Sequence, residues 1–360
     1  MLRYGIAEIF ENRTLLSQLE KANFDLVLTD PLFATGPMLA YYLIRSLVHD
    51  VRWLDSGEAH FLITPSPPSY VPISSSHLTD KMSFLQRMQN VIQSLIHLSI
   101  LELFIYPNYN ELCHRYLGPD TDIKTILFGA DVWLMRVDFV FEFPRPTMPN
   151  IVYIGGFQCK PAQPLAKVIW RYDGEIPPNI GSNTLLAKWI PQNDLLGHPN
   201  TRVFISHGGT NGIYEAIYHG VPVIGMPLIF DQFDNVVRLE SRGAAKVMNV
   251  ATMHSTDLLQ ALNEVINDTF YRDNMKKLSA LHRDQPELPM ERAVFWIEYV
   301  ARHKGAGHLR SEFYQLPWYV YYCVDVMIFL LSVFLLVTVL VVVTLKKLCS
   351  IACKKKQKTE

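Results

Sequence analysis

The sequence predicts an α/β chain with two successive domains built on parallel sheets, followed by one transmembrane helix. Three observations predict it. Short apolar runs such as FDLVLTD (24–30) and VFIS (203–206) have the length of buried parallel strands. Amphipathic runs such as STDLLQALNEVIND (255–268) are typical of the helices between such strands. The uncharged run from Val326 to Leu345 is long enough to cross a bilayer as a helix.

Composition limits the classes of protein that the chain can represent. The 360 residues suit about two domains, and 49% of them are hydrophobic, as in ordinary globular proteins. A formal net charge of −1 argues against a nucleic-acid partner. The five cysteines have neither zinc-site spacing nor the pattern of a disulfide framework, and no acidic cluster suggests a metal. We therefore expect no metal and no cofactor.

The N-terminal half begins with a charged, helical piece, residues 1–20, which lacks the apolar core of a signal peptide. FDLVLTD is a strand that ends at Asp30, where the carboxylate could simply cap a turn before Pro31. The run from 82 to 105 contains many polar side chains, which favours a buried or acceptor-facing helix over a membrane span. Residues 130–143 are interpreted as a strand pair, and 151–157 as the last strand before a linker.

The most informative stretch starts at VFIS, which predicts a buried parallel strand. Two glycines at 208 and 209 then turn the chain and let a ligand approach the backbone. The predicted helix from Thr210 to His219 has its N-terminus at that turn, where free N–H groups favour a bound diphosphate. Asn211 and Glu215 share one helix face, and Glu215 lies where it could accept both hydroxyls of a ribose.

Polar groups on either side of this helix complete a candidate nucleotide-sugar site. The next strand, VPVIGMP (221–227), leads to Asp231 and Gln232, whose carboxylate and amide suit hexose hydroxyls. Upstream, Trp189 offers a flat face for a base and Gln192 an amide for its edge. Taken alone, each residue has a plainer interpretation, such as a core aromatic or a turn cap. Their order on one strand–helix–strand frame favours the site.

The stretch WIPQ…HGGTNGIYE…DQ, from Trp189 to Gln232, resembles UDP-glycosyltransferases of the animal UDP-glucuronosyltransferase type. The resemblance continues through FPRPTMPNIVYIGG (143–156) and from Asp284 to Arg310. It implies a GT-B fold of two Rossmann-like domains. It also implies that the UDP-sugar, UDP-glucuronate in this family type, is held by Trp189, Gln192, His207, Gly209, Asn211, Gly212, Glu215, Asp231 and Gln232.

The resemblance assigns each of these groups a part of the donor. Trp189 and Gln192 would hold uracil and ribose, and Glu215 the ribose diol. His207, Asn211 and Gly212 would hold the diphosphate, while Asp231 and Gln232 would hold the sugar.

The same resemblance implies a reaction. A histidine base removes a proton from the hydroxyl of a small lipophilic acceptor, and the oxygen attacks the sugar with inversion, without a metal. Asp30 would orient that histidine, which the family carries in an upstream βα turn that these 360 residues do not contain. His49, His60 and His77 do not follow a strand in the manner of that base.

The expected domains differ from complete family members in two places. Residues 1–157 form an acceptor-binding domain without its first βα units, and residues 158–317 form a UDP-sugar-binding domain without its first βα unit. The second gap falls between Pro164 and Ala166, where the linker passes directly to KVIWRYDG, the second strand of that domain in the family. We expect this gap to remove an inner strand and to weaken the diphosphate site.

The C-terminal end predicts a single-pass membrane protein. Residues 318–345 hold an aromatic belt and the apolar helix, and residues 346–360 form a lysine-rich tail that the positive-inside rule places in the cytosol. The rest of the chain would be lumenal, where the sequons at Asn12 and Asn267 could be glycosylated. Lysines at 356 and 358 resemble a dilysine retrieval signal for the endoplasmic reticulum, or are a plain solvated tail.

Three functional hypotheses remain open from the sequence. The first is a membrane glycosyltransferase that acts on small lipophilic acceptors. The second is a catalytically inactive partner that forms homo- or hetero-oligomers with related transferases and modulates them. The third is another nucleotide-sugar enzyme on the same scaffold, such as an epimerase. Sugar transfer by the purified chain separates the first from the second, and product analysis separates the third.

Overall fold

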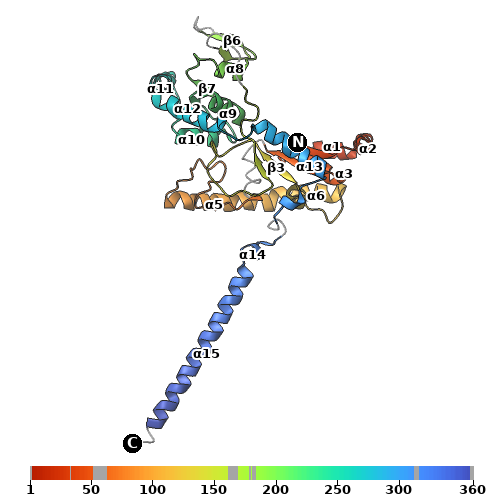
Figure 1. Cartoon of the computed structure of the whole chain (residues 1–360), viewed down its shortest axis with the longest axis vertical. Helices are drawn as coiled ribbons and strands as arrows, with labels where there is room; N and C mark the ends of the chain where they lie inside the picture. Colours follow the sequence, from red (N-terminus) through yellow and green to blue (C-terminus); the bar gives the residue numbers. More distant parts are fainter. Residues whose placement is uncertain are drawn as a thin grey trace. The chain divides into compact units, whose positions relative to one another are not determined.

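The computed structural model describes residues 2–32, 34–51, 63–160, 169–177, 180, 184–311 and 316–356. The chain forms two compact units, Met1–Arg310, here called the body, and Ser311–Glu360. In its described residues the body contains three parallel sheets with interspersed helices, an α/β architecture of the kind that the sequence predicts (Figure 1).

The N-terminal sheet is parallel throughout and has the strand order β1-β2-β3-β4. Its strands are β1 (Leu26–Thr29), β2 (Ser46–Val51), β3 (Val132–Met135) and β4 (Ile151–Tyr153). Its helices are α1 (Leu2–Glu11), α2 (Arg13–Ala22), α3 (Thr35–Leu43) and α7 (Ile123–Phe128). Phe10, Met38 and Ile126 lie in one apolar cluster of this half, and Val48, Val132 and Val152 in another. The strand at FDLVLTD is therefore confirmed.

The expected strand pair over residues 130–143 is wrong in its second member. Only β3 forms, and the chain turns at once after Val137. The Asp138 carboxylate accepts the backbone N–H groups of Val140 and Phe141, at 3.1 and 3.2 Å, which closes a turn in place of a strand. The apolar side chain of Phe141 is buried in this turn, so hydrophobicity alone did not distinguish turn from strand.

One helical run spans residues 84–116, as α5 (Phe84–Ile100), the π-helix η1 (Leu101–Ile105) and α6 (Tyr106–Tyr116). The helix over 82–105 is confirmed. Of its two expected settings, burial is wrong, and the acceptor-facing alternative stays a prediction. Most of its apolar side chains are exposed. In the most apolar 18-residue stretch of Phe84–Tyr116, only 17% is buried. The buried side chains of α5 are the polar Asn90 and Ser94, whereas farther along the run Leu101 and Leu112 pack in the apolar cluster that contains Phe10 and Met38.

The C-terminal half of the body contains two separate parallel sheets. β5 (Ile169–Arg171) pairs with β6 (Leu185–Ala187), and the second sheet has the order β7-β8-β9. The strands of that sheet are β7 (Phe204–Ser206), β8 (Val223–Gly225) and β9 (Ala245–Val247). The helices are α8 (Gln192–Leu196), α9 (Thr210–His219), α10 (Gln232–Ser241), α11 (Ser255–Asn267), α12 (Thr269–Arg283) and α13 (Pro289–His303), with the 3₁₀ turn η2 (Gly307–Leu309).

Strand β7 is an edge strand within the described residues, although VFIS predicts a buried one. Ile205 in its centre is 45% exposed, whereas its partner Ile224 on β8 is fully buried. Residues 161–168, which include the expected gap, lie outside the described residues. The exposure of Ile205 follows from the absence of a described strand on its far side.

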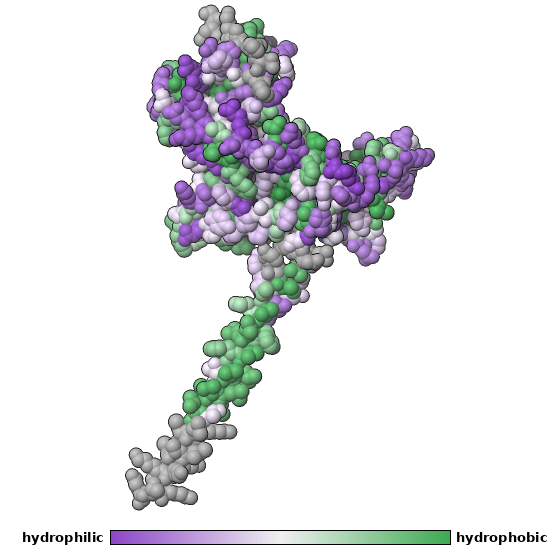
Figure 2. Space-filling view, in the orientation of Figure 1, coloured by the Kyte–Doolittle hydropathy of each residue, from purple (hydrophilic) through white to green (hydrophobic). Residues whose placement is uncertain are grey.

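The C-terminal unit is helical in its described residues. It contains α14 (Trp318–Tyr321) and α15 (Val324–Lys356), and α15 covers the predicted apolar run. The most apolar 18-residue stretch of Val324–Lys346 has a mean hydropathy of 3.3, and none of it is buried. This segment is therefore a candidate membrane span. Figure 2 shows this helix as a rod covered by apolar side chains.

Candidate functional site

A glycine turn fixes the N-terminus of α9. Gly208 has a φ of +88°, and a Cβ there would lie 2.6 Å from Val236 Cγ1 and 3.0 Å from the Gln232 carbonyl oxygen. Only glycine therefore fits, for conformation and for space. The next residue, Gly209, is extended and is the N-cap of α9. The sequence singled out Gly209, but Gly208 is the position at which the turn requires glycine.

Gln192 and Glu215 meet beside the first turns of α9. The Gln192 Nε2 group donates a hydrogen bond to Glu215 Oε2 at 2.8 Å, although 23 positions separate the two residues. A Cβ on Gly212 would lie 3.3 Å from that amide nitrogen, so the missing side chain leaves room for the pair. Burial raises the pKa of Glu215, against the opposing hydrogen bond from Gln192.

Asp231 belongs to a buried polar cluster that joins α10 to α9. Its Oδ2 accepts the Thr210 hydroxyl at 2.9 Å and the Asn235 amide at 2.7 Å. The same amide also donates to the Gly208 carbonyl oxygen at 2.9 Å. These contacts hold the Asp231 loop against the glycine turn. Sequence reasoning missed Thr210 and Asn235, although Asn235 follows Asp231 by one helical turn, which is the available signal.

Gln232 shapes the loop that precedes it. Its Oε1 accepts the backbone N–H groups of Leu228 and Ile229, at 2.9 and 3.1 Å. Between them and Gln232, Phe230 adopts a positive φ of 55°, which marks a sharp reversal of the chain. The carbonyl side of the Gln232 amide is therefore occupied by its own loop.

The remaining predicted donor groups lie at the surface. Trp189, in the loop before α8, is 75% exposed. His207 is exposed directly after β7, and Asn211 is exposed in the first turn of α9. The Asn211 carbonyl oxygen accepts the side-chain amide of Gln158, from the segment that leads into the C-terminal half, at 3.3 Å.

Asp30 lies in the turn that follows β1, where its Oδ1 accepts the Leu32 N–H at 2.9 Å. On the neighbouring strand, His49 is fully buried, and its ring lies 4.3 Å from that of Trp133. Burial lowers the pKa of His49 to about 4, so its imidazole is neutral at pH 7. His77 is exposed and stacks on Phe233 of α10 at 5.1 Å. His60 lies outside the described residues.

Buried polar contacts join the N-terminal sheet to the C-terminal half. Asp138 Oδ2 lies 2.7 Å from His282 Nδ1, and the Asp138 N–H donates to the Tyr214 hydroxyl at 2.7 Å. Glu142 forms an ion pair with Arg238 at 3.2 Å, and both side chains are buried. These contacts come from the turn after β3, α9, α10 and α12.

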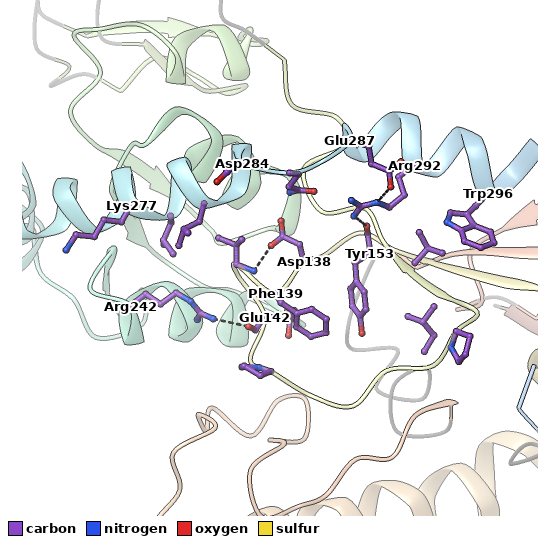
Figure 3. Close-up of a pocket in the computed structure, with 18 of the residues that line it drawn as sticks. Asp138, Phe139, Glu142, Tyr153, Arg242, Lys277, Asp284, Glu287, Arg292 and Trp296 are labelled. Carbon is purple, nitrogen blue, oxygen red and sulfur yellow. Dashed lines mark hydrogen bonds and ion pairs between the residues drawn. The ribbon is translucent and has the colours of Figure 1, made fainter. Parts of the chain in front are cut away.

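A cavity of about 1060 Å³ adjoins this cluster (Figure 3). Its lining comes mainly from the turn after β3, from β4, from α12 and from α13. Figure 3 shows Arg242 directed toward the Glu142 backbone and Arg292 paired with Glu287. The cavity contains none of the predicted donor residues, so the candidate site is distinct from it.

Within the described part of the chain, no group of three or more His, Cys, Asp or Glu side chains is arranged to hold a metal ion. The charged and polar groups gathered at the glycine turn are instead suited to an organic ligand with hydroxyl groups and an anionic centre.

The family model "UDP-glucoronosyl and UDP-glucosyl transferase" matches residues 1–167 and 166–359. The chain is 42% identical to "UDP-glucuronosyltransferase 2B33" of Macaca mulatta over 371 residues, which cover 90% of this chain and 70% of that relative. It is 43% identical to "UDP-glucuronosyltransferase 2C1" of Oryctolagus cuniculus, over 89% of this chain and 73% of that relative.

Solved structures show the same GT-B fold. Glycosyltransferase VinC, in complex with DTDP, matches with a TM-score of 0.54 and 16% identity, over 84% of this chain and 82% of that one. Phytolacca americana UGT2, complexed with UDP-2fluoro-glucose and pterostilbene, matches with a TM-score of 0.51 and 16% identity, over 84% of this chain and 80% of that one.

The family match breaks at one internal position. Its two parts meet at residues 166 and 167, beside Pro164. The alignment with the macaque relative runs over 371 residues while covering 90% of this 360-residue chain, so the relative has residues inside the aligned region that have no counterpart here. With a family model that matches almost every residue and relatives above 40% identity, the chain is a glycosyltransferase of the UDP-glucuronosyl and UDP-glucosyl transferase family.

Proposed function

We propose that this chain binds a UDP-sugar at the glycine turn and transfers the sugar to a hydroxyl of a small lipophilic acceptor, with inversion. The observation that carries the proposal is the convergence of Gln192 and Glu215, 2.8 Å apart, beside the N-terminus of α9. A half-buried carboxylate next to a helix N-terminus suits a ribose diol whose diphosphate occupies that N-terminus.

The remaining donor groups are assigned around this pair. Trp189, which is 75% exposed, stacks on uracil, while Gln192 binds the base and ribose. His207, Gly209, Asn211 and Gly212 face the diphosphate at the start of α9. The sugar, which is glucuronate in the reaction for which the relatives above are named, binds at the loop of Asp231 and Gln232. The buried cluster of Asp231 with Thr210 supports this step by fixing that loop against the turn.

The chemistry needs a base for the acceptor hydroxyl. Asp30 would orient that base, and its position directly after the carboxyl end of β1 supports this role. No histidine precedes Asp30 in these 360 residues, and His49 is buried and neutral. The negative charge that develops on the departing diphosphate is stabilised by the N–H groups at the N-terminus of α9 and by side-chain donors.

Calorimetric titration with UDP tests the donor site. Glu215→Ala removes the proposed ribose acceptor and leaves Gln192 unpaired, so UDP should bind about 5- to 150-fold more weakly, or about 1–3 kcal/mol. Glu298→Ala, an exposed glutamate on α13, is the matched control and should bind as the wild type does. Equal affinities for all three proteins would end the assignment of Glu215.

A second function, that of an inactive partner of related transferases, is favoured by one observation. In the described residues no strand joins the pair β5 and β6 to the sheet β7-β8-β9, and the family match breaks just before β5. A missing first βα unit accounts for both facts and would remove phosphate-binding groups. Radiolabelled sugar transfer by the purified chain distinguishes the two: UDP binding without transfer supports the partner function.

We further propose a single-pass topology in the endoplasmic reticulum membrane, with the body in the lumen and the tail in the cytosol. The apolar segment Val324–Lys346 and the lysines that follow support it. Asn12 and Asn267 are both exposed, as glycosylation would require. Protease added to intact microsomes should shorten only the tail. Digestion of the body would reverse the orientation.

A further inference from the structure

The cavity beside the turn after β3 has the properties of a binding site for a small organic molecule. Its volume of about 1060 Å³ is at the upper end of the range of roughly 300–1,000 Å³ that such sites occupy. Its lining is largely apolar and contains a few charged side chains (Figure 3). In small-molecule sites the apolar lining binds the body of the ligand, and the few polar groups fix its orientation.

Apolar side chains in this lining are open to solvent. Phe139 and Leu281 are 41% and 59% exposed, although both line the cavity. The Phe139 ring lies 4.5 Å from the ring of Tyr153, measured between centroids, and Trp296 of α13 also lines the cavity. An apolar ligand that covered these side chains would remove them from water, which favours binding.

The carboxylates of the lining are mostly paired within the protein. Those with a described partner are Asp138 with His282, Glu142 with Arg238 and Glu287 with Arg292. Asp284, the C-cap of α12, is exposed and lies two helical turns beyond Lys277, about 10 Å along the axis. The carboxylates therefore leave two cations of the lining, Arg242 and Lys277, without an ion pair among the described residues.

Arg242 is a half-buried cation whose described hydrogen bonds go to the backbone. Its guanidinium donates to the carbonyl oxygens of Arg238 and Glu142, at 2.9 and 3.0 Å, and lies 5.2 Å from the centroid of the Phe143 ring. Burial lowers the pKa of Arg242, against the opposing negative charge of Glu142. The guanidinium is thus fixed in place and retains N–H donors that an anion can accept.

Lys277 supplies a second cation on the same side of the cavity. Asn274, on the preceding turn of α12, donates from its side-chain amide to the Gly243 carbonyl oxygen at 3.3 Å, which holds α12 against the residue next to Arg242. Figure 3 shows Lys277 and Arg242 on the left of the cavity and Trp296 on the right. The cavity therefore has a cationic end beside an apolar lining.

We propose that this cavity binds a small amphipathic anion, with its acidic group on Arg242 and Lys277 and its apolar body against Phe139 and Leu281. A carboxylate, sulfate or sulfonate has the oxygen acceptors that a guanidinium and an ammonium group bind. Because Arg242 is the C-cap of α10, the ligand contacts the helix that begins at Gln232 in the proposed donor loop. The anion site itself does not depend on the donor site.

The probe for this site is naphthalene-2-sulfonate, which has an apolar ring body, one negative charge and no hydroxyl for sugar transfer. Naphthalene-2-sulfonamide is the neutral ligand of nearly the same shape. The full chain in lipid nanodiscs is titrated with each ligand by calorimetry, with protein-free nanodiscs as the blank. The sulfonate should bind at least about tenfold more tightly, because its charge-assisted hydrogen bonds are absent in the sulfonamide.

Substitutions locate the bound anion. Arg242→Gln should weaken sulfonate binding by about 10- to 100-fold, and Lys277→Gln by about 2- to 5-fold, since Lys277 is exposed. The sulfonamide should bind both variants as it binds the wild type. The matched control is Lys276→Gln, an exposed lysine on the same helix that lies beside Gly220 and does not line the cavity. The control should bind the sulfonate as the wild type does.

Melting temperatures show whether each variant is folded, and if Arg242→Gln is not, the comparison of Lys277→Gln with Lys276→Gln decides. A sulfonate that stays bound when UDP is added supports the proposal. Equal affinities for sulfonate and sulfonamide would overturn it, as would equal sulfonate affinities of the Lys277 and Lys276 variants. Displacement of the sulfonate by UDP would overturn it too, because the anion would then occupy the diphosphate site.

Discussion

His49 is a residue whose charge the fold controls. It lies inside β2, its Nε2 is 3.2 Å from the Leu127 carbonyl oxygen, and burial lowers its pKa to about 4. An unfolded histidine has a pKa of about 6.5. The native state therefore favours the neutral form. Above pH 6.5 the imidazole is neutral in both the folded and the unfolded chain, so His49 does not destabilise the fold. As the pH falls from 6.5 toward 4, the unfolded chain binds a proton that the folded chain does not, and stability is lost.

Replacing His49 should remove part of the acid sensitivity of the body. By linkage, the buried imidazole costs the native state about 2 kcal/mol at pH 5 and about 3 kcal/mol at pH 4. His49→Gln keeps a polar side chain that does not titrate in this range. Denaturant unfolding should therefore show that the free energy of unfolding falls less between pH 7 and pH 5 in the variant than in the wild type. Identical losses would mean that the imidazole is not sealed from protons in the native state.

The grouping of some candidate donor residues around the start of α9 was predictable, because the strand–glycine turn–helix pattern that carries them is local in the sequence. Gln192 and Glu215 do meet, and Gly209 caps α9. The sequence could not assign Gly208 its specific role, since that role depends on Val236 from another helix. It likewise missed Thr210 and Asn235, because the buried cluster around Asp231 exists only when α9 and α10 pack together. The binding roles themselves remain predictions.

At the level of elements, strongly periodic segments were predicted well. Helix α9 spans Thr210–His219 as expected, and β8 and α11 form within the predicted stretches. The errors are of burial and of turns. Strand β7 and helix α5 are apolar enough for a core, yet tertiary context leaves them exposed. The strand pair fails because Asp138 closes a turn that hydrophobicity does not reveal.

The two paired strands β7 and β8 should differ in how much stability they lose when a central isoleucine is replaced. Ile224→Ala on β8 opens a cavity in a packed sheet and should cost about 2–5 kcal/mol of unfolding free energy. Ile205→Ala, at the paired position on β7, should cost less than half of that, since Ile205 is 45% exposed. Denaturation midpoints provide the comparison. Similar losses would show that the far side of β7 is covered.

Across the whole molecule, the two halves of the body depend on buried polar contacts. The Tyr214 hydroxyl accepts the Asp138 N–H and donates to the Asp138 carboxylate at 3.3 Å, while His282 binds the other oxygen. Tyr214→Phe leaves a buried N–H unpaired and should lower the unfolding free energy by about 1–3 kcal/mol. Tyr218→Phe, on the same helix, is the control and should melt close to the wild type.

Restoring the internal gap should restore donor binding. We expect the residues that the macaque relative has at the break, inserted between Pro164 and Ala166, to supply the strand and phosphate loop that the family resemblance implies. UDP affinity should then rise by at least about tenfold, as several hydrogen bonds to a charged group are regained. Calorimetric titration with UDP of the protein that carries the insertion, compared with the 360-residue chain, measures this gain. No gain would mean that the existing turn already supplies the diphosphate contacts.

Helix α15 continues as a regular helix to Lys356, beyond the apolar run that ends at Leu345. With that run filling the hydrocarbon, roughly ten further residues extend about 15 Å past it as a stiff rod. A rod of that length passes through the headgroup layer. The helix end at Lys356 would then stand beyond the headgroup layer, and deleting two turns after Leu345 should draw it back into that layer.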